Sequence, residues 1–181
     1  MGIVRRGSLR NLSSIPLKHL YLFAFPFVAF VAMYIVALFG HFSFRGYAGL
    51  LNIVNYILLL VALGANLHIQ DLRIIWGGTF LNFLVCAANG GYMPISEKAA
   101  KIAGLANIIN PSREGEFVRH VLLTADSKLK WLADVIPLPG FGPHTPEVAS
   151  IGDVVITIGI FMLIQRYMCI RKSSLEKKKP H

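Results

Sequence analysis

The residues best suited to chemistry lie in the second half of the chain, between two apolar segments. They are His120, Asp126, Asp134 and His144. An imidazole changes charge near neutral pH and a carboxylate can accept a proton, so such a set could perform general acid–base catalysis. The sequence holds no H-E-x-x-H, CxxC, phosphate-binding lysine loop or G-x-S-x-G motif to join them. We therefore expect no metal site. We keep His120, Asp126 and Asp134 as catalytic candidates beside the simpler prediction that they are surface or structural residues.

Polar side chains also occur inside the apolar segments. They are Asn52, Asn55, Asn66, Asn82, Asn89 and Asp153. At about 100° per residue, the first three share one sector of a helix, and the next two share a face of the following helix. Because amide and carboxyl groups are costly in lipid, we expect these side chains to face one another in a polar interior. Hydrogen bonds between helices are the favoured interpretation, and a lined cavity or ligand pocket is the alternative.

Asp153 stands near the start of the last apolar segment, in the string SIGD at 150–153. A carboxylate there could cap the helix at its positive dipole end, or it could pair with a cation such as Arg45. Either structural role is favoured over a proton relay or an ion site. The two cysteines, Cys86 and Cys169, fall towards opposite sides of the membrane, and we expect both to be buried thiols.

Composition defines the class of protein that must position these residues. Of 181 residues, 55% are hydrophobic and 15% are charged, and the mean hydropathy is +0.58. In soluble chains about a quarter of all residues are charged, so an ordinary soluble domain is disfavoured. The apolar content excludes intrinsic disorder, and two cysteines are too few for a disulfide scaffold. The composition therefore indicates a membrane protein.

Four segments are long and apolar enough to cross about 30 Å of hydrocarbon as helices. They cover about residues 20–39, 46–66, 72–89 and 151–170, the first three falling within residues 19–89. Pro26 in the first segment is tolerable in a membrane helix, and Arg73 in the third must extend its side chain towards the interface. We predict an all-α membrane protein with four transmembrane helices.

The net charge of +9 is concentrated at the two ends of the chain. Residues 1–18 hold four basic residues and no acidic one, and residues 166–181 hold six basic residues and one glutamate. Because basic residues favour the cytoplasmic side, both termini, including the tail 171–181, are predicted to be cytoplasmic, with residues 90–150 outside. The basic residues form no nucleic-acid-binding motif, so we expect membrane lipid, and no nucleic acid, as a partner.

The segment 90–150 begins with a turn-forming motif. The motif residues are Gly90, Gly91, Met93 and Pro94. The two glycines can adopt the positive φ that tight turns require, and Ser96 could cap a short helix that follows. The pattern predicts a defined fold for this segment.

The rest of the segment mixes apolar and charged residues. The stretch 114–136 is typical of short amphipathic helices on the bilayer surface, with Trp131 at headgroup depth. A Pro- and Gly-rich return at 137–146 should be extended. We expect residues 90–150 to form an extracytoplasmic lid over the transmembrane helices.

Four ordered strings carry a family resemblance. They are NGGYMP at 89–94, HxLLT at 120–124, WLADVIP at 131–137 and SIGDVV at 150–155. Through them the chain resembles an uncharacterised family of small bacterial integral membrane proteins, classified as a domain of unknown function, over most of its length. Members of that family often begin with one more apolar segment, so the resemblance implies a shortened chain. It implies the bacterial cytoplasmic membrane as location and no particular activity.

Three functions fit these observations. The favoured one is a small accessory or anchoring subunit of a larger bacterial membrane complex, with other membrane subunits as partners and with lipid or quinone held between helices. The second is an enzyme at the outer leaflet that acts through His120, Asp126 and Asp134. The third is an oligomeric transporter in which Asp153 and the asparagines line the path.

Overall fold

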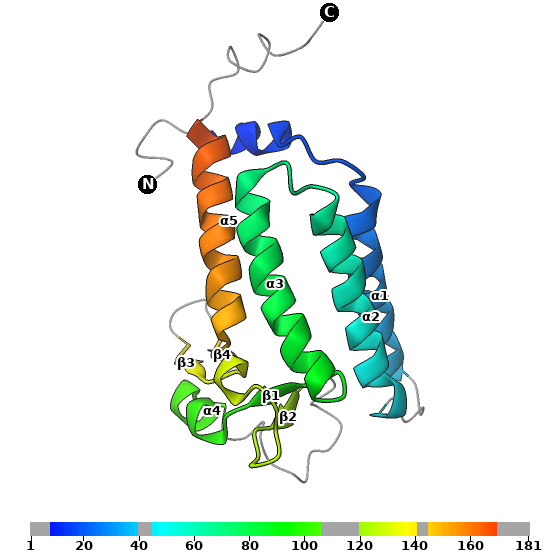
Figure 1. Ribbon diagram of the computed structural model, residues 1–181, viewed down its shortest axis with the longest axis vertical. Helices are drawn as coiled ribbons and strands as arrows, with labels where there is room; N and C mark the ends of the chain where they lie inside the picture. The colour runs from blue at the N-terminus through cyan, green and yellow to red at the C-terminus, as the bar shows by residue number, and fades with distance from the viewer. Residues whose placement is uncertain (1–7, 40–44, 106–119, 141–144, 170–181) are drawn as a thin grey trace, which may run out of the picture.

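The computed structural model describes residues 8–39, 45–105, 120–140 and 145–169. Within these ranges the protein is mostly helical, and four long helices run side by side (Figure 1). They are α1 (Tyr21–Phe39), α2 (Arg45–Gly64), α3 (Gln70–Ala88) and α5 (Ile151–Cys169). Each helix begins and ends within two residues of an apolar segment found in the sequence. Pro26 lies inside α1, as expected.

The four long helices form a row, which we name the helical layer. α3 packs against α5 on one side and against α2 on the other, and α1 packs against α2 (Figure 1). Glycines bring α3 and α5 close together. A Cβ atom on Gly78 would lie 2.6 Å from the carbonyl oxygen of Gly152 and 2.9 Å from the amide nitrogen of Ile156. Small residues therefore set the α3–α5 distance, as is common between membrane helices.

Aromatic side chains lie between α2 and α3. The Trp76 indole donates a hydrogen bond to the carbonyl oxygen of Leu60 across this space, at 3.1 Å. Trp76 stacks on Phe80 with ring centroids 5.2 Å apart, and Phe83 continues the row towards Tyr56 of α2. Aromatic packing and one polar tether thus hold α2 against α3.

The 3-10 helix η1 (Leu9–Ser14) lies across one end of the helical layer (Figure 1). The backbone amide of Ser8 and the side-chain amide of Asn11 both donate to the carbonyl oxygen of Met168, each at 3.1 Å. These bonds satisfy a carbonyl that the end of α5 would otherwise leave unpaired. Leu12 packs on a buried cluster that includes Leu72. We call this the η1 end.

The opposite end carries a small α/β subdomain, which we name the cap and which is the described part of residues 90–150 (Figure 1). Its elements are β1 (Met93–Ile95), α4 (Glu97–Ala103), β2 (His120–Leu122), the 3-10 helix η2 (Lys130–Leu132), β3 (Ile136–Leu138) and β4 (Glu147–Ala149). β1 pairs with β2 in parallel, with Met93 opposite His120. β3 pairs with β4 antiparallel, with Ile136 opposite Ala149.

The expectation that this segment contains short helices alone was wrong. Among the residues that the structure describes, the stretch 120–136 forms β2, a turn, η2 and the start of β3 rather than an amphipathic helix. The physical reason is backbone pairing between segments distant in sequence, because Ile95 of β1 bridges to Asp134 and extends the β1–β2 pair. Of the predicted extended return at 137–146, residues 137 and 138 lie in β3 and residues 141–144 lie outside the described part of the chain. The Ser96 hydroxyl accepts a hydrogen bond from Ala99 at 3.3 Å as the predicted cap of α4.

Glycines dock the cap on the helical layer. Gly90 and Gly91 have φ values of 70° and 91°, so the predicted turn uses the positive φ that glycine permits. A Cβ atom on Gly91 would collide with the backbone of Gly49 in α2. The side chain of Asn52 donates to the carbonyl oxygen of Gly91 at 2.7 Å. The NGGYMP turn is therefore a fixed joint between cap and helices.

Two helices among the described residues are long and apolar enough to cross a membrane, α3 and α5 through Met168, and Ala48–Gly64 of α2 is a shorter apolar stretch. Large apolar side chains are exposed along the helical layer. They include Phe25, Phe27 and Val28 of α1, Leu50, Val54 and Val61 of α2, and Val154, Ile158 and Phe161 of α5. These features indicate membrane association.

Candidate functional site

The fold brings His120 and Asp134 together in the cap, where His120 begins β2 and Asp134 forms an isolated bridge just before β3. The Nε2 atom of His120 lies 3.3 Å from Oδ2 of Asp134. β1 lies between their segments, since it pairs with β2 on one side and its Ile95 bridges to Asp134. The backbone of Asp134 is fixed in both directions, because its amide donates to Pro94 and its carbonyl accepts from Ser96, each at 2.9 Å.

The electrostatics of this pair are unequal. Asp134 is 3% exposed, whereas the His120 side chain is 40% exposed. Burial raises the pKa of Asp134 above its ordinary value of 3.8; His120 lowers this pKa in part, and the charges of Asp153 and Glu147 raise it further. Oδ1 of Asp134 accepts no hydrogen bond from any residue that the structure describes. A buried carboxyl with one oxygen unused and an accessible imidazole beside it can hold and transfer a proton.

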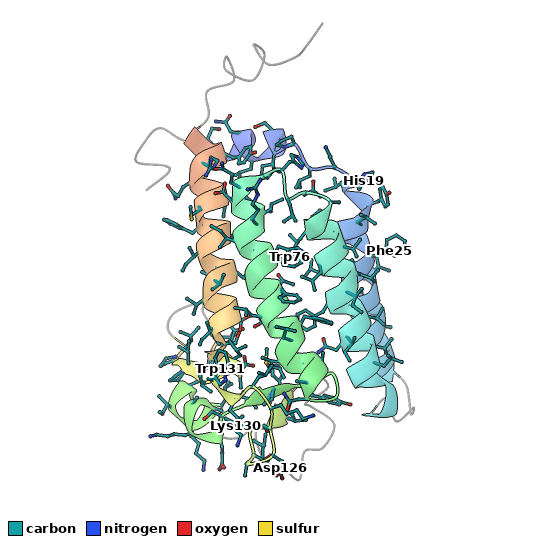
Figure 2. All side chains as sticks on the ribbon, in the orientation of Figure 1. His19, Phe25, Trp76, Asp126, Lys130 and Trp131 are labelled. Carbon is teal, nitrogen blue, oxygen red and sulfur yellow. The ribbon has the colours of Figure 1, made fainter. Side chains whose placement is uncertain are left out.

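The other acid–base candidates are placed differently. Asp126 is exposed in a turn at the tip of the cap, on the side away from the helices (Figure 2). His144 lies outside the described residues. In the part of the chain that the structure describes, no three His, Cys, Asp or Glu side chains gather as metal ligands would. The predicted catalytic set is thus represented by the pair His120 and Asp134.

Asp153 forms a reciprocal cap with Ser150 at the start of α5. The Asp153 amide donates to the Ser150 hydroxyl at 3.0 Å, and the Ser150 amide donates to Oδ2 of Asp153 at 2.9 Å. This is the geometry of a capping box, so the predicted capping role is confirmed. The side chain of Asn82 in α3 donates to Oδ1 of Asp153 at 2.7 Å and ties the cap to the next helix. The alternative partner, Arg45, has a side chain outside the described part of the chain.

The remaining asparagines mostly hold backbone segments. Asn66 is fully buried just after α2, and its amide bonds both the amide and the carbonyl of Lys18, at 2.6 and 2.9 Å. Asn89 does the same for Lys128 just after α3, at 2.9 and 3.0 Å. The buried Oδ1 of Asn55 accepts no hydrogen bond within the described residues. These contacts support the interpretation of the asparagines as structural hydrogen-bonding groups.

Sequence reasoning missed a buried ion pair at the η1 end. Asp71 is fully buried in the first turn of α3, and the Nε and Nη2 atoms of Arg166 lie 2.7 and 3.0 Å from its carboxylate oxygens. The signal was present in the sequence. Asp71 directly precedes the third apolar segment and Arg166 lies near the end of the fourth, so two antiparallel helices place them at the same level.

Residues of the sequence motifs have contrasting environments. Met93 and Pro94 are buried in β1, where Met93 packs with Val85 and Cys86 of α3. Cys86 is a buried thiol as predicted, and the side chain of Cys169 is outside the described set. Trp131, in contrast, is 68% exposed on η2. Of the predicted lid motif, Met93 and Pro94 are therefore packing residues, and Trp131 is a surface residue.

The fold and site define a mostly helical protein with apolar membrane-type helices and an acid–imidazole pair in a small cap. A model of a family of unknown function, DUF5317, matches residues 14–165, and the chain belongs to this family. The resemblance inferred from the sequence strings is thereby confirmed. An uncharacterised protein of Thermotoga maritima is 27% identical over 157 residues, which are 86% of this chain and 79% of that protein. No solved structure matches the chain.

Proposed function

We propose that the protein is an integral membrane protein with four spans, α1, α2, α3 and α5, whose termini are cytoplasmic and whose cap is outside, and that it serves as an accessory or anchoring subunit of a larger bacterial membrane complex. Support for four spans comes from the side-by-side packing of four helices of similar length with exposed apolar side chains. Support for the orientation comes from the basic ends of the sequence.

The observation that carries the accessory role is the use of the polar groups. Asn52, Asn66 and Asn89 bond to backbone groups, and Asn82 and Asp153 bond to each other. Polar groups engaged in this way stiffen the helical layer instead of lining a path. The row of helices leaves apolar faces on both sides, which suit contacts with lipid and with neighbouring helices of other subunits.

A lipid or quinone between helices is part of this proposal. The aromatic row Trp76, Phe80 and Phe83 lies between α2 and α3, and rings of this kind can stack on a quinone head or contact acyl chains. The Asn55 oxygen in α2 supplies an acceptor that no described residue uses. A hydroxyl of a reduced quinone or a lipid headgroup could donate to it.

The experiment is purification of the tagged protein from its native membrane in lipid nanodiscs, followed by mass spectrometry of co-purified chains, lipids and quinones. We expect a defined partner in stoichiometric amount. The test variant is Phe161→Ala, which removes one exposed ring from α5 and should weaken a contact made by that face. A lone monomer without associated protein in both nanodiscs and mild detergent would contradict the accessory role.

A second candidate is acid–base chemistry at the outer leaflet, favoured by the 3.3 Å approach of His120 to buried Asp134. Asp126 would then assist from solvent and not within the pair. The test is incubation of the protein in nanodiscs of bacterial polar lipids, with mass spectrometry of headgroups over time. Headgroup loss with the native chain that stops in His120→Gln supports this candidate, and unchanged lipid in all samples removes it.

The oligomeric transporter has weaker support. Both carboxylate oxygens of Asp153 are engaged, Oδ1 by Asn82 and Oδ2 by Ser150, which leaves little for a transported ion. Ion flux in proteoliposomes is the direct measurement. Flux that Asp153→Asn abolishes would favour the transporter, and flux that this variant leaves unchanged, or no flux at all, would remove its main support.

A further inference from the structure

The turn 128–132 of the cap is held rigidly against the outer end of α3. Asn89, which follows α3, bonds both backbone groups of Lys128. Leu132 is buried with Val85 of α3, and Leu129 packs against the same cluster. η2 also contacts the start of α5. The turn is therefore fixed at the level where two long helices end.

Leu129 adopts an unusual backbone conformation that shapes this turn. Its φ is 52°, in the left-handed region that residues other than glycine and asparagine rarely adopt. This conformation lets Leu129 and Leu132 point into the cluster while Trp131 remains 68% exposed. A strained residue held by packing is a sign that the orientation of its neighbours matters. The neighbour whose side chain this turn leaves exposed is Trp131.

The side chains of the cap follow a gradient along the long axis of the molecule. Trp131 lies beside the start of α5, Lys130 lies farther from the helices, and Asp126 lies farthest (Figure 2). Lys128 and Lys130 are exposed, and Lys130 Nζ donates to the carbonyl oxygen of Ala125. This order matches a membrane boundary, where an indole sits at the base of the headgroups, lysines reach the phosphates, and carboxylates stay in water.

The exposed indole stands on an element that contacts α5. Ile151 and Val154, on the first turn of α5, are exposed large apolar residues, and η2 packs beside this helix. Exposed apolar side chains at the start of a membrane helix, with an exposed indole and two exposed lysines nearby, fit one occupant by their chemistry, the headgroup layer of acidic phospholipids.

We infer that the turn 128–131 is a lipid contact: Trp131 inserts at the headgroup boundary of the outer leaflet, and Lys128 and Lys130 face acidic phospholipid. The inference rests on the proposed four-span topology. The lipid contact attaches the cap directly to the membrane, in addition to the joint at Gly49 and Gly91 that holds the cap on the helices.

The chain holds two tryptophans, so each can be observed alone. Trp76→Phe leaves Trp131, and Trp131→Phe leaves Trp76 in the middle of α3 (Figure 2). Both full-length variants are placed in nanodiscs of phosphatidylglycerol and phosphatidylcholine that carry bromine either near the headgroup or near the chain ends. We expect shallow bromine to quench Trp131 at least twofold more than deep bromine, and bromine at any depth to quench Trp76.

The outcomes separate the two proposals. If Trp76 is quenched and Trp131 is quenched only by acrylamide from water, the lipid contact is wrong and the four-span proposal stands. If neither tryptophan is quenched by brominated lipid, the membrane topology itself is wrong. If Trp131 is shielded from both lipid bromine and acrylamide, protein covers it and the lipid contact is overturned.

The charge of the turn is tested by a matched pair of variants. Lys128→Gln with Lys130→Gln should lower the shallow quenching of Trp131 in phosphatidylglycerol nanodiscs and leave it unchanged in pure phosphatidylcholine. Lys98→Gln with Lys101→Gln removes the same charge from α4 of the cap and should have no effect on Trp131. Equal effects of the two pairs, or no effect of either, would overturn the assignment of the lysines to lipid.

Discussion

The two ends of the helical layer each hold one buried carboxylate, but they neutralise it differently. At the η1 end, Asp71 faces the guanidinium of Arg166, with two contacts of 2.7 and 3.0 Å. At the cap end, Asp134 faces the imidazole of His120 at 3.3 Å. Arginine stays charged at any physiological pH, whereas histidine does not.

The Asp71–Arg166 pair is a structural ion pair, whereas the Asp134–His120 pair contains a titratable imidazole. Asp71 and Arg166 join α3 to α5 as an ion pair. Asp134 keeps a costly position without full compensation, and groups kept at such cost are often functional. Both ends share the same backbone device, an asparagine after a helix that holds a lysine residue: Asn66 with Lys18 and Asn89 with Lys128. The two ends therefore share this asparagine–lysine contact and differ in the partner of the buried carboxylate.

The largest effect should follow from breaking the Asp71–Arg166 ion pair. Arg166→Ala leaves the carboxylate of Asp71 buried without a counter-charge, and we expect a loss of about 3 kcal/mol in unfolding free energy. We place the loss at the low end of the range for buried pairs because the Arg166 side chain is 46% exposed. Unfolding by SDS titration in mixed micelles measures it. The control Arg166→Lys keeps the charge and should lose less than half as much.

Arg166→Ala combined with Asp71→Asn should recover much of the loss, because the buried charge is removed together with its partner. If the double variant is no more stable than Arg166→Ala alone, the ion pair is not the reason for the instability, and the structural role that we assign to this pair is wrong.

The next effect compares the two asparagine devices. Asn66 is fully buried and makes three hydrogen bonds, two to Lys18 and one to the carbonyl of Ala62, so Asn66→Ala should cost about 2 kcal/mol. Asn89 is partly exposed, and Asn89→Ala should cost about 1 kcal/mol because water can replace its bonds. The same SDS titration compares both variants. An equal or reversed order would contradict the view that burial sets the difference.

The smallest effect is a pH dependence at the cap end. Because the pKa of Asp134 is raised in the folded protein, its contribution to stability is present in acid and is lost as pH rises from 3.8 through the raised value. Asp134→Asn removes that loss. The variant should therefore gain stability relative to the native chain as the pH rises from acid to neutral.

Thermal unfolding across this pH range, in one detergent, is the measurement. Asp126→Asn, at an exposed position of the same cap, should follow the native pH profile. A native profile that is flat, or one that Asp134→Asn leaves unchanged, would show that the buried carboxyl carries no linked proton and would remove the contrast with Asp71.

Hydropathy alone predicts the long helices, because length and apolar content set them locally. The sequence also predicts three local features, because each depends on residues close in sequence. They are Pro26 within α1, the glycines of the cap joint and the Ser150–Asp153 capping pair. The family was recognisable from ordered strings. These features share one property: their physics is local.

Features that depend on distant contacts could not be predicted. The β1–β2 pair joins residues that are 27 positions apart, from Met93 to His120, and only the fold brings Asp134 next to them. The side chains of His120 and Asp126 look equally suitable in the sequence, yet one contacts Asp134 and the other is at the tip of the cap (Figure 2). The Asp71–Arg166 pair needed antiparallel helices at matching depth.

We propose that the two ends lie on opposite sides of a membrane, and cysteine labelling in intact cells tests this topology most directly. Ala125→Cys in the cap and Ala65→Cys after α2 both stand at exposed positions, and the native chain, whose Cys86 is buried, sets the background. A membrane-impermeant maleimide should label the cysteine at 125 in intact cells and the cysteine at 65 only after permeabilisation. Equal labelling of both in intact cells, or the reverse order, would contradict the account.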